Sequence, residues 1–293
     1  MSQRGETAPR GVPFLVKTAL PAAPFFIDTH SHFDAAEFDA DRDAEHTRAV
    51  TAGVGIQIVP SVARSNFAAV AGVCTRYTGC LPAWGLHPMY VAVHTPDDLD
   101  ALRAQIQAQR PVAVGEIGLD LFVRGLDVAA QEHYYVEQLR IAREHDLPVL
   151  LHCRKSSDLL LKHLRRIRVP GGIAHAFNGS AQQAAEFIKL GFKLGFGGAF
   201  TWPRANHLRR LAVDLPLAAI VLETDSPDIP PVWIGRGRNA PAELPRIAQT
   251  LAELRGLTVD AVAEATTRNA CDVLGLTSDS GGRTYTQRRT LAL

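Results

Sequence analysis

The sequence has few cysteines, almost no net charge and no long apolar run. Its four cysteines form neither a Cys-x-x-Cys pair nor a disulfide framework, so we expect a reduced protein of the cytoplasm. The 31 basic residues nearly balance the 30 acidic ones, which gives a net charge of +1. Non-specific duplex binders are usually more basic, so any contact with nucleic acid would be confined to a site. No apolar run could cross a bilayer, and we expect no membrane association.

The composition is that of a globular protein with a substantial core. The chain has 293 residues, of which 46% are hydrophobic and 21% charged. Composition does not shift within residues 25–276, so we expect one domain there. In residues 1–24, Lys17 and several prolines interrupt an apolar patch, which favours an N-terminal arm over a signal peptide. Residues 277–293 are polar and basic, and we expect a flexible tail.

Eight short apolar stretches alternate with helical patterns along the chain. The stretches are residues 25–32, 55–60, 81–88, 111–120, 147–152, 172–177, 192–198 and 219–225. The helical patterns cover residues 37–52, 66–77, 95–110, 127–145, 157–166, 181–190, 206–213, 244–254 and 259–274. This alternation predicts an α/β protein, either a parallel (β/α)8 TIM barrel or a doubly wound open sheet. Polar residues recur where the stretches end, which favours the barrel, because its strand ends meet at one mouth.

Six candidate metal ligands lie at the ends of five of these stretches. His30 and His32 are two residues apart, so on a strand they would point to the same face. The other four are Glu116, His152, His175 and Asp225. One histidine at a strand end is more often structural, but five strands that carry metal-capable residues at corresponding places predict a metal site.

The six side chains suit two divalent ions if Glu116 bridges them. One ion would be held by His30, His32, Glu116 and Asp225, and the other by Glu116, His152 and His175. Two ions roughly 3.5–4 Å apart polarise a phosphoryl oxygen and activate water. Asp225 can accept a proton from that water, so Asp225 and Glu116 are the predicted catalytic residues. Histidine-rich sites favour Zn, Mn, Co or Ni, and mixed sites also hold Mg when substrate phosphate adds oxygens.

Six motifs resemble, in their order, the series of the TatD family, a branch of the metal-dependent hydrolases with an amidohydrolase-like barrel. They are residues 28–34 (DTHSHFD), 85–88 (GLHP), 115–120 (GEIGLD), 151–154 (LHCR), 175–179 (HAFNG) and 223–227 (ETDSP). The resemblance implies a divalent-metal hydrolase, with members that are DNases, including 3′-to-5′ exonucleases. It implies the same six ligands and a place at the substrate for His87, for which a structural role in a loop is the alternative.

The loops after the last two stretches carry candidate substrate contacts. These are Trp202, Arg204, Trp233 and Arg236. Barrels often bind phosphate with these loops, arginine binds phosphate in a bidentate manner, and tryptophan can stack on a base. Arg154, two residues past His152, would add a phosphate contact. The alternative is that the tryptophans pack the rim and the arginines only face solvent. The substrate expected from this pattern is a DNA or oligonucleotide end, with no obligate protein partner.

Three functions fit the predicted site. The first is a deoxyribonuclease or phosphodiesterase of the 3′-5′ exonuclease type. The second is an amidohydrolase or esterase that acts on a small molecule with the same metals. Many amidohydrolase-like sites bridge their ions with a modified lysine on the fourth strand, whereas this chain has Glu116 there and no lysine between Arg110 and Arg124. The third, a metal-bound scaffold without activity, is disfavoured by a complete ligand set with room for water.

Overall fold

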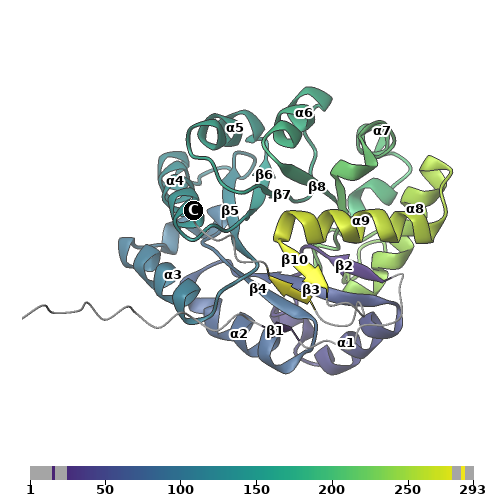
Figure 1. Ribbon diagram of the computed structural model, residues 1–293, viewed down its shortest axis with the longest axis horizontal. Helices are drawn as coiled ribbons and strands as arrows, with labels where there is room; N and C mark the ends of the chain where they lie inside the picture. The colour runs from purple at the N-terminus through teal and green to yellow at the C-terminus, as the bar shows by residue number, and fades with distance from the viewer. Residues whose placement is uncertain (1–14, 17–24, 279–284, 288–293) are drawn as a thin grey trace, which may run out of the picture.

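The structure, a computed structural model, describes residues 15–16, 25–278 and 285–287. Within residues 25–278, eight parallel strands pair in chain order and form a barrel (Figure 1). The strands are β2 (Phe26–Asp28), β3 (Val54–Pro60), β4 (Cys80–Trp84), β5 (Ala113–Asp120), β6 (Val149–Arg154), β7 (Gly172–Ala174), β8 (Phe192–Phe196) and β9 (Ile220–Leu222). The predicted (β/α)8 TIM barrel is therefore confirmed, and the doubly wound sheet is excluded.

The helices form a ring around these strands (Figure 1). Those among the described residues are α1 (Arg42–Thr51), α2 (Phe67–Arg76), α3 (Pro96–Ala108), α4 (Val128–Glu144), α5 (Ser157–Arg166), α6 (Ala181–Lys189), α7 (Asn206–Asp214), α8 (Leu244–Arg255) and α9 (Val259–Leu274). Short 3-10 helices in the loops are η1 (Ala36–Phe38), η2 (Arg64–Asn66), η3 (Pro88–Val93), η4 (Gly198–Thr201), η5 (Leu217–Ala219) and η6 (Pro241–Glu243). No helix in the described part of the chain is long and apolar enough to cross a membrane.

The barrel closes between its first and last strands. The backbone N–H of Thr29 donates to Leu222 O at 3.1 Å, and that of Asp225 donates to His30 O at 2.8 Å. A parallel bridge between Ser31 and Ser226 continues the closure. The contact between the first and last strands therefore brings together the predicted ligands His30 and Asp225, which are nearly 200 positions apart in sequence.

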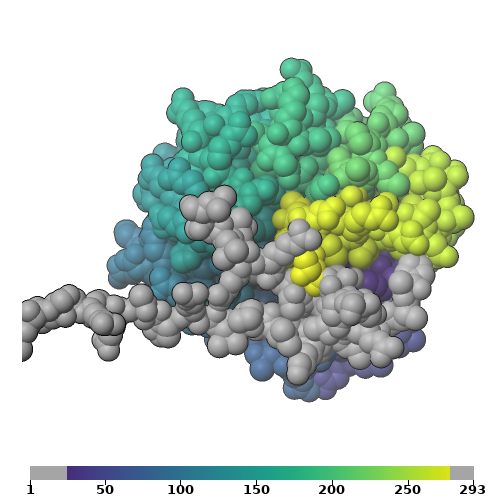
Figure 2. Space-filling view, in the orientation of Figure 1, coloured from purple at the N-terminus to yellow at the C-terminus, as the bar shows by residue number. Residues whose placement is uncertain are grey.

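One end of the barrel is filled and covered, which leaves the other for function. Aliphatic side chains such as Ile58 and Leu150 pack inside the strands together with Ala270 and Leu274 of α9. Helix α9 crosses this end in Figure 1, and its side chains (yellow) occupy the middle of the same face in Figure 2. Thr267 of α9 donates to Phe25 O, just before β2, so the covered end holds the amino ends of the strands. The carboxyl ends, where barrel enzymes have their sites, are opposite.

Several expected elements are shorter or divided in the structure, and two of them show why. The helix expected over 37–52 is divided into η1 and α1, because the Arg42 guanidinium binds the carbonyls of the preceding loop, including Ala35 O at 2.8 Å. The stretch expected to continue to residue 88 ends at Trp84. Pro88 has no N–H to give to a strand ladder and begins η3 instead. Gly85 lies so close to β5 that a Cβ there would be 2.5 Å from the carbonyl carbon of Gly115.

The segments before and after the barrel contribute to a small antiparallel sheet. Its strands are β1 (Leu15–Val16), β11 (Tyr285–Gln287) and β10 (Leu276–Ser278), in that order. The sequence did not predict this pairing, because strands of two or three residues show no alternation that could be detected. The rest of the predicted arm (1–24) and tail (277–293) lies outside the described residues.

Candidate metal centre

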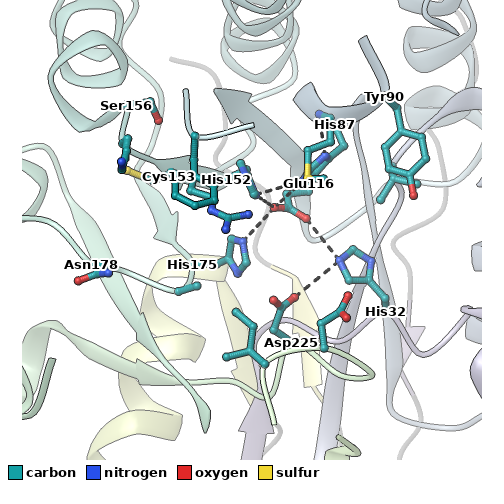
Figure 3. A pocket seen from close by; sticks show the side chains of 18 of the residues that line it. His32, His87, Tyr90, Glu116, His152, Cys153, Ser156, His175, Asn178 and Asp225 are labelled. Carbon is teal, nitrogen blue, oxygen red and sulfur yellow. Dashed lines mark hydrogen bonds and ion pairs between the residues drawn. The ribbon is translucent and has the colours of Figure 1, made fainter. Parts of the chain in front are cut away.

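Glu116 of β5 lies at the centre of the histidine cluster and is 1% exposed (Figure 3). Its Oε2 is 3.0 Å from His30 Nε2 and 3.5 Å from His32 Nε2. Its Oε1 is 2.9 Å from His152 Nδ1 and 3.0 Å from His175 Nε2. The two oxygens of one carboxylate therefore face two separate pairs of histidines, as the predicted bridge requires.

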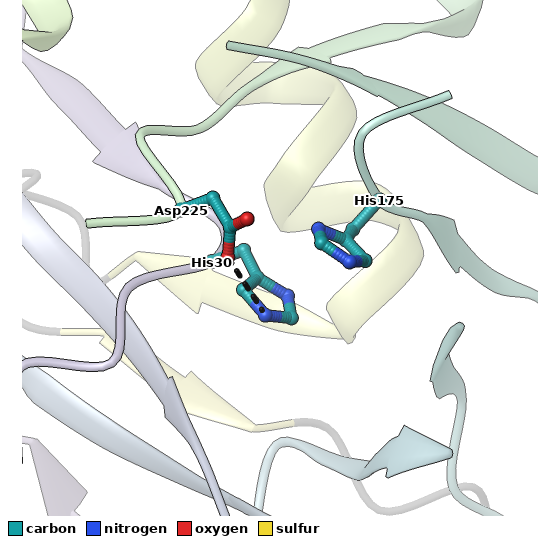
Figure 4. Close-up of side chains that lie close together, drawn as sticks. All are labelled: His30, His175 and Asp225. Carbon is teal, nitrogen blue, oxygen red and sulfur yellow. Dashed lines mark ion pairs between the residues drawn. The ribbon is translucent and has the colours of Figure 1, made fainter. Parts of the chain in front are cut away.

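Asp225 lies beside His30, one member of the first pair (Figure 4). Its Oδ1 is 3.6 Å from His30 Nε2 and 3.8 Å from His32 Nε2. The rings of His30 and His175 stack at 4.0 Å between centroids, which brings the two pairs together. Asp225 has a φ of +55°, a conformation that few non-glycine residues adopt and that is found repeatedly at active sites. All six predicted ligands are thus in one cluster, although His30 and His32 follow β2 instead of lying within it.

The donor atoms fit divalent cations. The Nε2 atoms of His30 and His32 are 3.3 Å apart, and both lie against the same oxygen of Glu116. Imidazole nitrogens that converge with a carboxylate oxygen on one point are the usual ligands of a transition-metal ion. Three groups of such atoms, each within 4.8 Å of one another, occur among the described residues: His30–His32–Glu116, His30–His175–Asp225 and His87–Glu116–His152.

The charges of the cluster depend on burial and on close contacts. Burial would raise the pKa of Glu116, but His87 and His175 outweigh it and hold that pKa well below its usual value. Burial, together with the charge of His175, lowers the pKa of His30 to about 3. Burial also opposes protonation of His32, yet its contact with Glu116 raises its pKa to about 9. A divalent ion would displace protons from such a site, so metal binding would be coupled to proton release.

The position of the ring proton decides what His87 can do at the cluster. Burial lowers its pKa to about 4, so the ring is neutral near pH 7. Its Nδ1 accepts the backbone N–H of Met89 at 3.1 Å, which assigns the proton to Nε2. That N–H lies 3.1 Å from Glu116 Oε1. His87 belongs to one of the three groups above, but in this tautomer its Nε2 has no lone pair for a metal, so His87 is a hydrogen-bond donor at the cluster. The hydrogen bond from Met89 N–H is the kind of loop contact expected if His87 had a structural role, and here it also fixes the tautomer of the ring.

Asp120, at the end of β5, orients His152. Its Oδ2 is 3.0 Å from His152 Nε2, and its Oδ1 accepts the backbone N–H groups of Phe122 and Val123 at 2.8 and 2.9 Å. With Nε2–H donated to Asp120, the lone pair of His152 Nδ1 faces Glu116. This is the usual way in which a carboxylate fixes the tautomer of a metal-binding histidine. The sequence signal was present, because Asp120 ends the motif that contains Glu116.

We expect Asp120→Asn to weaken metal binding and activity by roughly 10–100-fold. The amide keeps an oxygen for the loop N–H groups but loses the charge that holds His152 in its tautomer. Metal affinity is measured by competition with a chelator, and Asp97→Asn on the exposed side of α3 is the control. An affinity equal to that of the wild type would show that His152 needs no such partner.

Glu223 is a second buried carboxylate that the sequence analysis did not assign. Its Oε1 accepts the backbone N–H of Ala176 at 2.5 Å and lies 3.7 Å from His175 Nδ1. Gly195 makes room for it, since a Cβ there would be 2.1 Å from Glu223 Oε2. Glu223 therefore holds the turn after His175, where Ala176 has a φ of +44°. It lies two residues before Asp225, and this spacing was the available signal.

A cleft of about 1470 Å³ opens over the cluster (Figure 3). His32, His87, Glu116, His152, His175 and Asp225 line it, and so does Arg154. The contact of Arg154 with phosphate stays a prediction, and the position of Arg154 in the cleft is compatible with it. The described residues that line the cleft also include Tyr90 and Phe122, which the sequence analysis missed.

The four predicted contacts on the last two loops are not among the described residues that line this cleft. The Trp233 indole N–H donates to Glu243 Oε2 at 2.8 Å, and Arg246 covers the ring at 4.3 Å, so Trp233 packs the rim against α8. These contacts fit the alternative in which the tryptophan packs the rim, and the contact of Trp233 with substrate stays a prediction. Trp202, Arg204 and Arg236 are exposed outside the cleft, and their contact with substrate stays a prediction.

A barrel that gathers histidines and carboxylates at the carboxyl ends of its strands defines the class of amidohydrolase-like metal-dependent hydrolases. Residues 27–275 match the family described as TatD related DNase. The chain therefore belongs to the TatD family of metal-dependent hydrolases, as the motifs had indicated.

Two relatives and one solved structure support this membership, and a second solved structure shares the fold. The chain is 43% identical over 248 residues to YjjV, an uncharacterized metal-dependent hydrolase of Escherichia coli K12, covering 83% of this chain and 95% of that one. It is 35% identical over 237 residues to the 3'-5' ssDNA/RNA exonuclease TatD of Cronobacter sakazakii, covering 78% and 90%. The crystal structure of YjjV has a TM-score of 0.81 at 42% identity, covering 85% and 97%. A mutant organophosphorus hydrolase from Deinococcus radiodurans has a TM-score of 0.60 at 14% identity, covering 92% and 100%, and shares the fold alone.

Proposed function

We propose that this chain is a two-metal deoxyribonuclease, a phosphodiesterase that shortens DNA or oligonucleotide ends in the 3′-5′ direction. The observation that carries the proposal is the division of the histidines by Glu116. One oxygen faces His30 and His32, and the other faces His152 and His175, at 2.9–3.5 Å. A carboxylate so placed could hold two divalent ions, and a pair of ions would supply the two-metal chemistry by which many enzymes hydrolyse phosphodiesters. A relative with 35% identity that is named as a 3'-5' ssDNA/RNA exonuclease supports the same substrate class.

The protein's own side chains have distinct roles in this proposal. Divalent ions (Mg, Mn or Zn), when bound, supply the Lewis acid that polarises the phosphodiester and activates water. Asp225 accepts the proton of the attacking water. His87, with its proton on Nε2, would turn the N–H that now faces Glu116 Oε1 to an oxygen of the substrate. Arg154, which is half-exposed in the cleft, binds a phosphate.

The location and assembly of the enzyme follow as further parts of the proposal. All four cysteines lie among the described residues and are free, which suits a reducing compartment. We therefore propose that the enzyme acts in the cytoplasm. It would act on nucleic-acid ends without an obligate protein partner, because one chain supplies every side chain to which the proposal gives a role.

The test is hydrolysis of 5′-labelled single-stranded DNA by protein that is stripped of metal and reloaded with Mg, Mn or Zn. We expect a ladder that shortens from the 3′ end, requires metal and disappears with chelator. A panel of small esters and amides runs in parallel. If DNA stays intact while a small ester or amide is cleaved, the protein is an amidohydrolase or esterase with the same site, and the nuclease proposal is wrong.

A further inference from the structure

The cleft has one wall that exposes apolar side chains. Met89 and Tyr90 of η3 are 42% and 47% exposed, and Leu121 and Phe122 after β5 are 37% and 49% exposed. All four line the cleft, and the two segments follow the neighbouring strands β4 and β5. Large apolar side chains that gather on the surface beside polar groups usually mark a binding surface.

Two cations lie on the ring of Phe122. The Arg154 guanidinium carbon is 4.1 Å from the ring centroid, and Lys155 Nζ is 4.9 Å from it. Both residues line the cleft. The carboxylate that the structure places near them is Asp120, whose Oδ2 is 3.9 Å from Arg154 Nη1 and is already shared with His152. Cation–π contacts therefore hold two positive charges over the mouth of the cleft in a fixed place.

Tyr90 lies on the same wall, next to the metal centre. Its ring meets that of His87 edge to face, with centroids 6.0 Å apart and planes at 80°. His87 in turn contacts Glu116 at 3.1 Å. Figure 3 shows Tyr90 beside His87 at the edge of the pocket. The contact with His87 orients the Tyr90 ring at a short distance from the predicted reacting phosphate, while nearly half of the side chain stays accessible.

We propose that this wall is the nucleotide subsite of the cleft, with Tyr90 stacking on the unpaired 3′-terminal base. Arg154 and Lys155, positioned by Phe122, would bind the phosphate on the 5′ side of the scissile one. The inference rests on the proposed nuclease function and deepens it. A terminal base that is paired in a duplex is held by its partner strand and would have to unpair to enter the cleft and stack on Tyr90, so this subsite selects single-stranded ends. In this proposal Tyr90 stacks on the base, whereas the sequence led us to expect this contact from Trp202 and Trp233.

Variants of the stacking residue test the first half of the proposal. Loss of one base–aromatic contact should raise KM roughly 10-fold in Tyr90→Ala with little change in kcat, whereas Tyr90→Phe should behave as the wild type. An oligonucleotide with an abasic 3′-terminal nucleotide should show no difference between Tyr90→Ala and the wild type. An equal effect on both oligonucleotides would overturn the stacking role.

Variants of the cation pair test the second half. Phe122→Ala should raise KM for a short oligothymidylate roughly 10-fold, and Phe122→Tyr, which keeps an aromatic face, should restore it. The dinucleotide TpT has no phosphate beyond the scissile one and should be unaffected. Lys155→Met should reduce the salt dependence of oligonucleotide binding by about 0.7 in the slope of log Kd against log salt. An unchanged slope, or an equal effect on TpT, would overturn the phosphate contact.

The experiment separates this inference from the proposed function. Val213→Ala, an exposed site on α7 outside the cleft lining, is the control and should match the wild type. Thermal unfolding confirms that each variant is folded. If wild-type protein cleaves no DNA with any metal, the nuclease proposal itself fails. If it cleaves DNA and the wall variants match Val213→Ala, or if Trp202→Ala alone raises KM, only the subsite inference is wrong.

Discussion

Replacement of Glu116 by alanine should remove metal-dependent hydrolysis and lower the bound metal below two ions per chain. Glu116 gives one oxygen to His30 at 3.0 Å and the other to His152 at 2.9 Å, so its loss takes a ligand from both predicted ions. We expect kcat to fall at least ~10³-fold, because each factor of ten is about 1.4 kcal/mol and a metal ion contributes several kcal/mol to the transition state. Metal content by mass spectrometry and cleavage of single-stranded DNA measure the two effects.

Two further variants serve as the comparison and the control for Glu116→Ala. Glu116→Gln keeps the size and one oxygen but loses the charge, so we expect it to retain more metal than Glu116→Ala. Glu253→Ala, on the exposed side of α8, should keep wild-type metal and rate. Two ions per chain in Glu116→Ala would show that Glu116 is not the bridge.

Asp225→Asn should leave the fold and most of the metal in place while kcat falls at least ~10²-fold. The amide has the size of the carboxylate, and its oxygen can still face His30 and His32, from which Asp225 Oδ1 lies 3.6 and 3.8 Å. An amide cannot accept the proton of the attacking water, so the chemical step should be affected more than substrate binding. Steady-state kinetics with saturating metal measure kcat and KM separately.

Asp272→Asn, on the exposed side of α9, is the matched control and should behave as the wild type. Unchanged turnover in Asp225→Asn would refute its role as the base. A loss of metal in proportion to the loss of activity would show that Asp225 acts as a ligand alone and has no separate role as the base.

The sequence predicted the barrel because each strand is a short apolar run between turn signals, and each of the eight runs overlaps a strand of the barrel. The errors fall where the chain leaves the strand ladder to build the site. His30 and His32 lie beyond the end of β2, and Pro88 begins η3 where a strand was expected. At such places side chains and loop contacts decide the backbone, and hydrophobic periodicity gives no signal.

The candidate ligands could be predicted because the strand ends of a parallel barrel must converge. Residues at corresponding places on strands far apart in sequence therefore meet, as His30 and His152 do around Glu116. The substrate contacts could not be predicted in the same way. Trp233 and Phe122 are both loop aromatics in the sequence, yet Trp233 is bonded to Glu243 on the rim and Phe122 lines the cleft.

The sequence by itself determined the fold class, the family and the set of donor side chains, because all three depend on local periodicity and on the order of motifs along the chain. Only the tertiary structure decided which oxygen of Glu116 faces which histidine, that Met89 fixes the proton of His87, and which aromatic side chains open onto the cleft. These features depend on atoms from separate loops that meet when β2 and β9 close the barrel. A pattern within one segment contains no information about the distances between such loops.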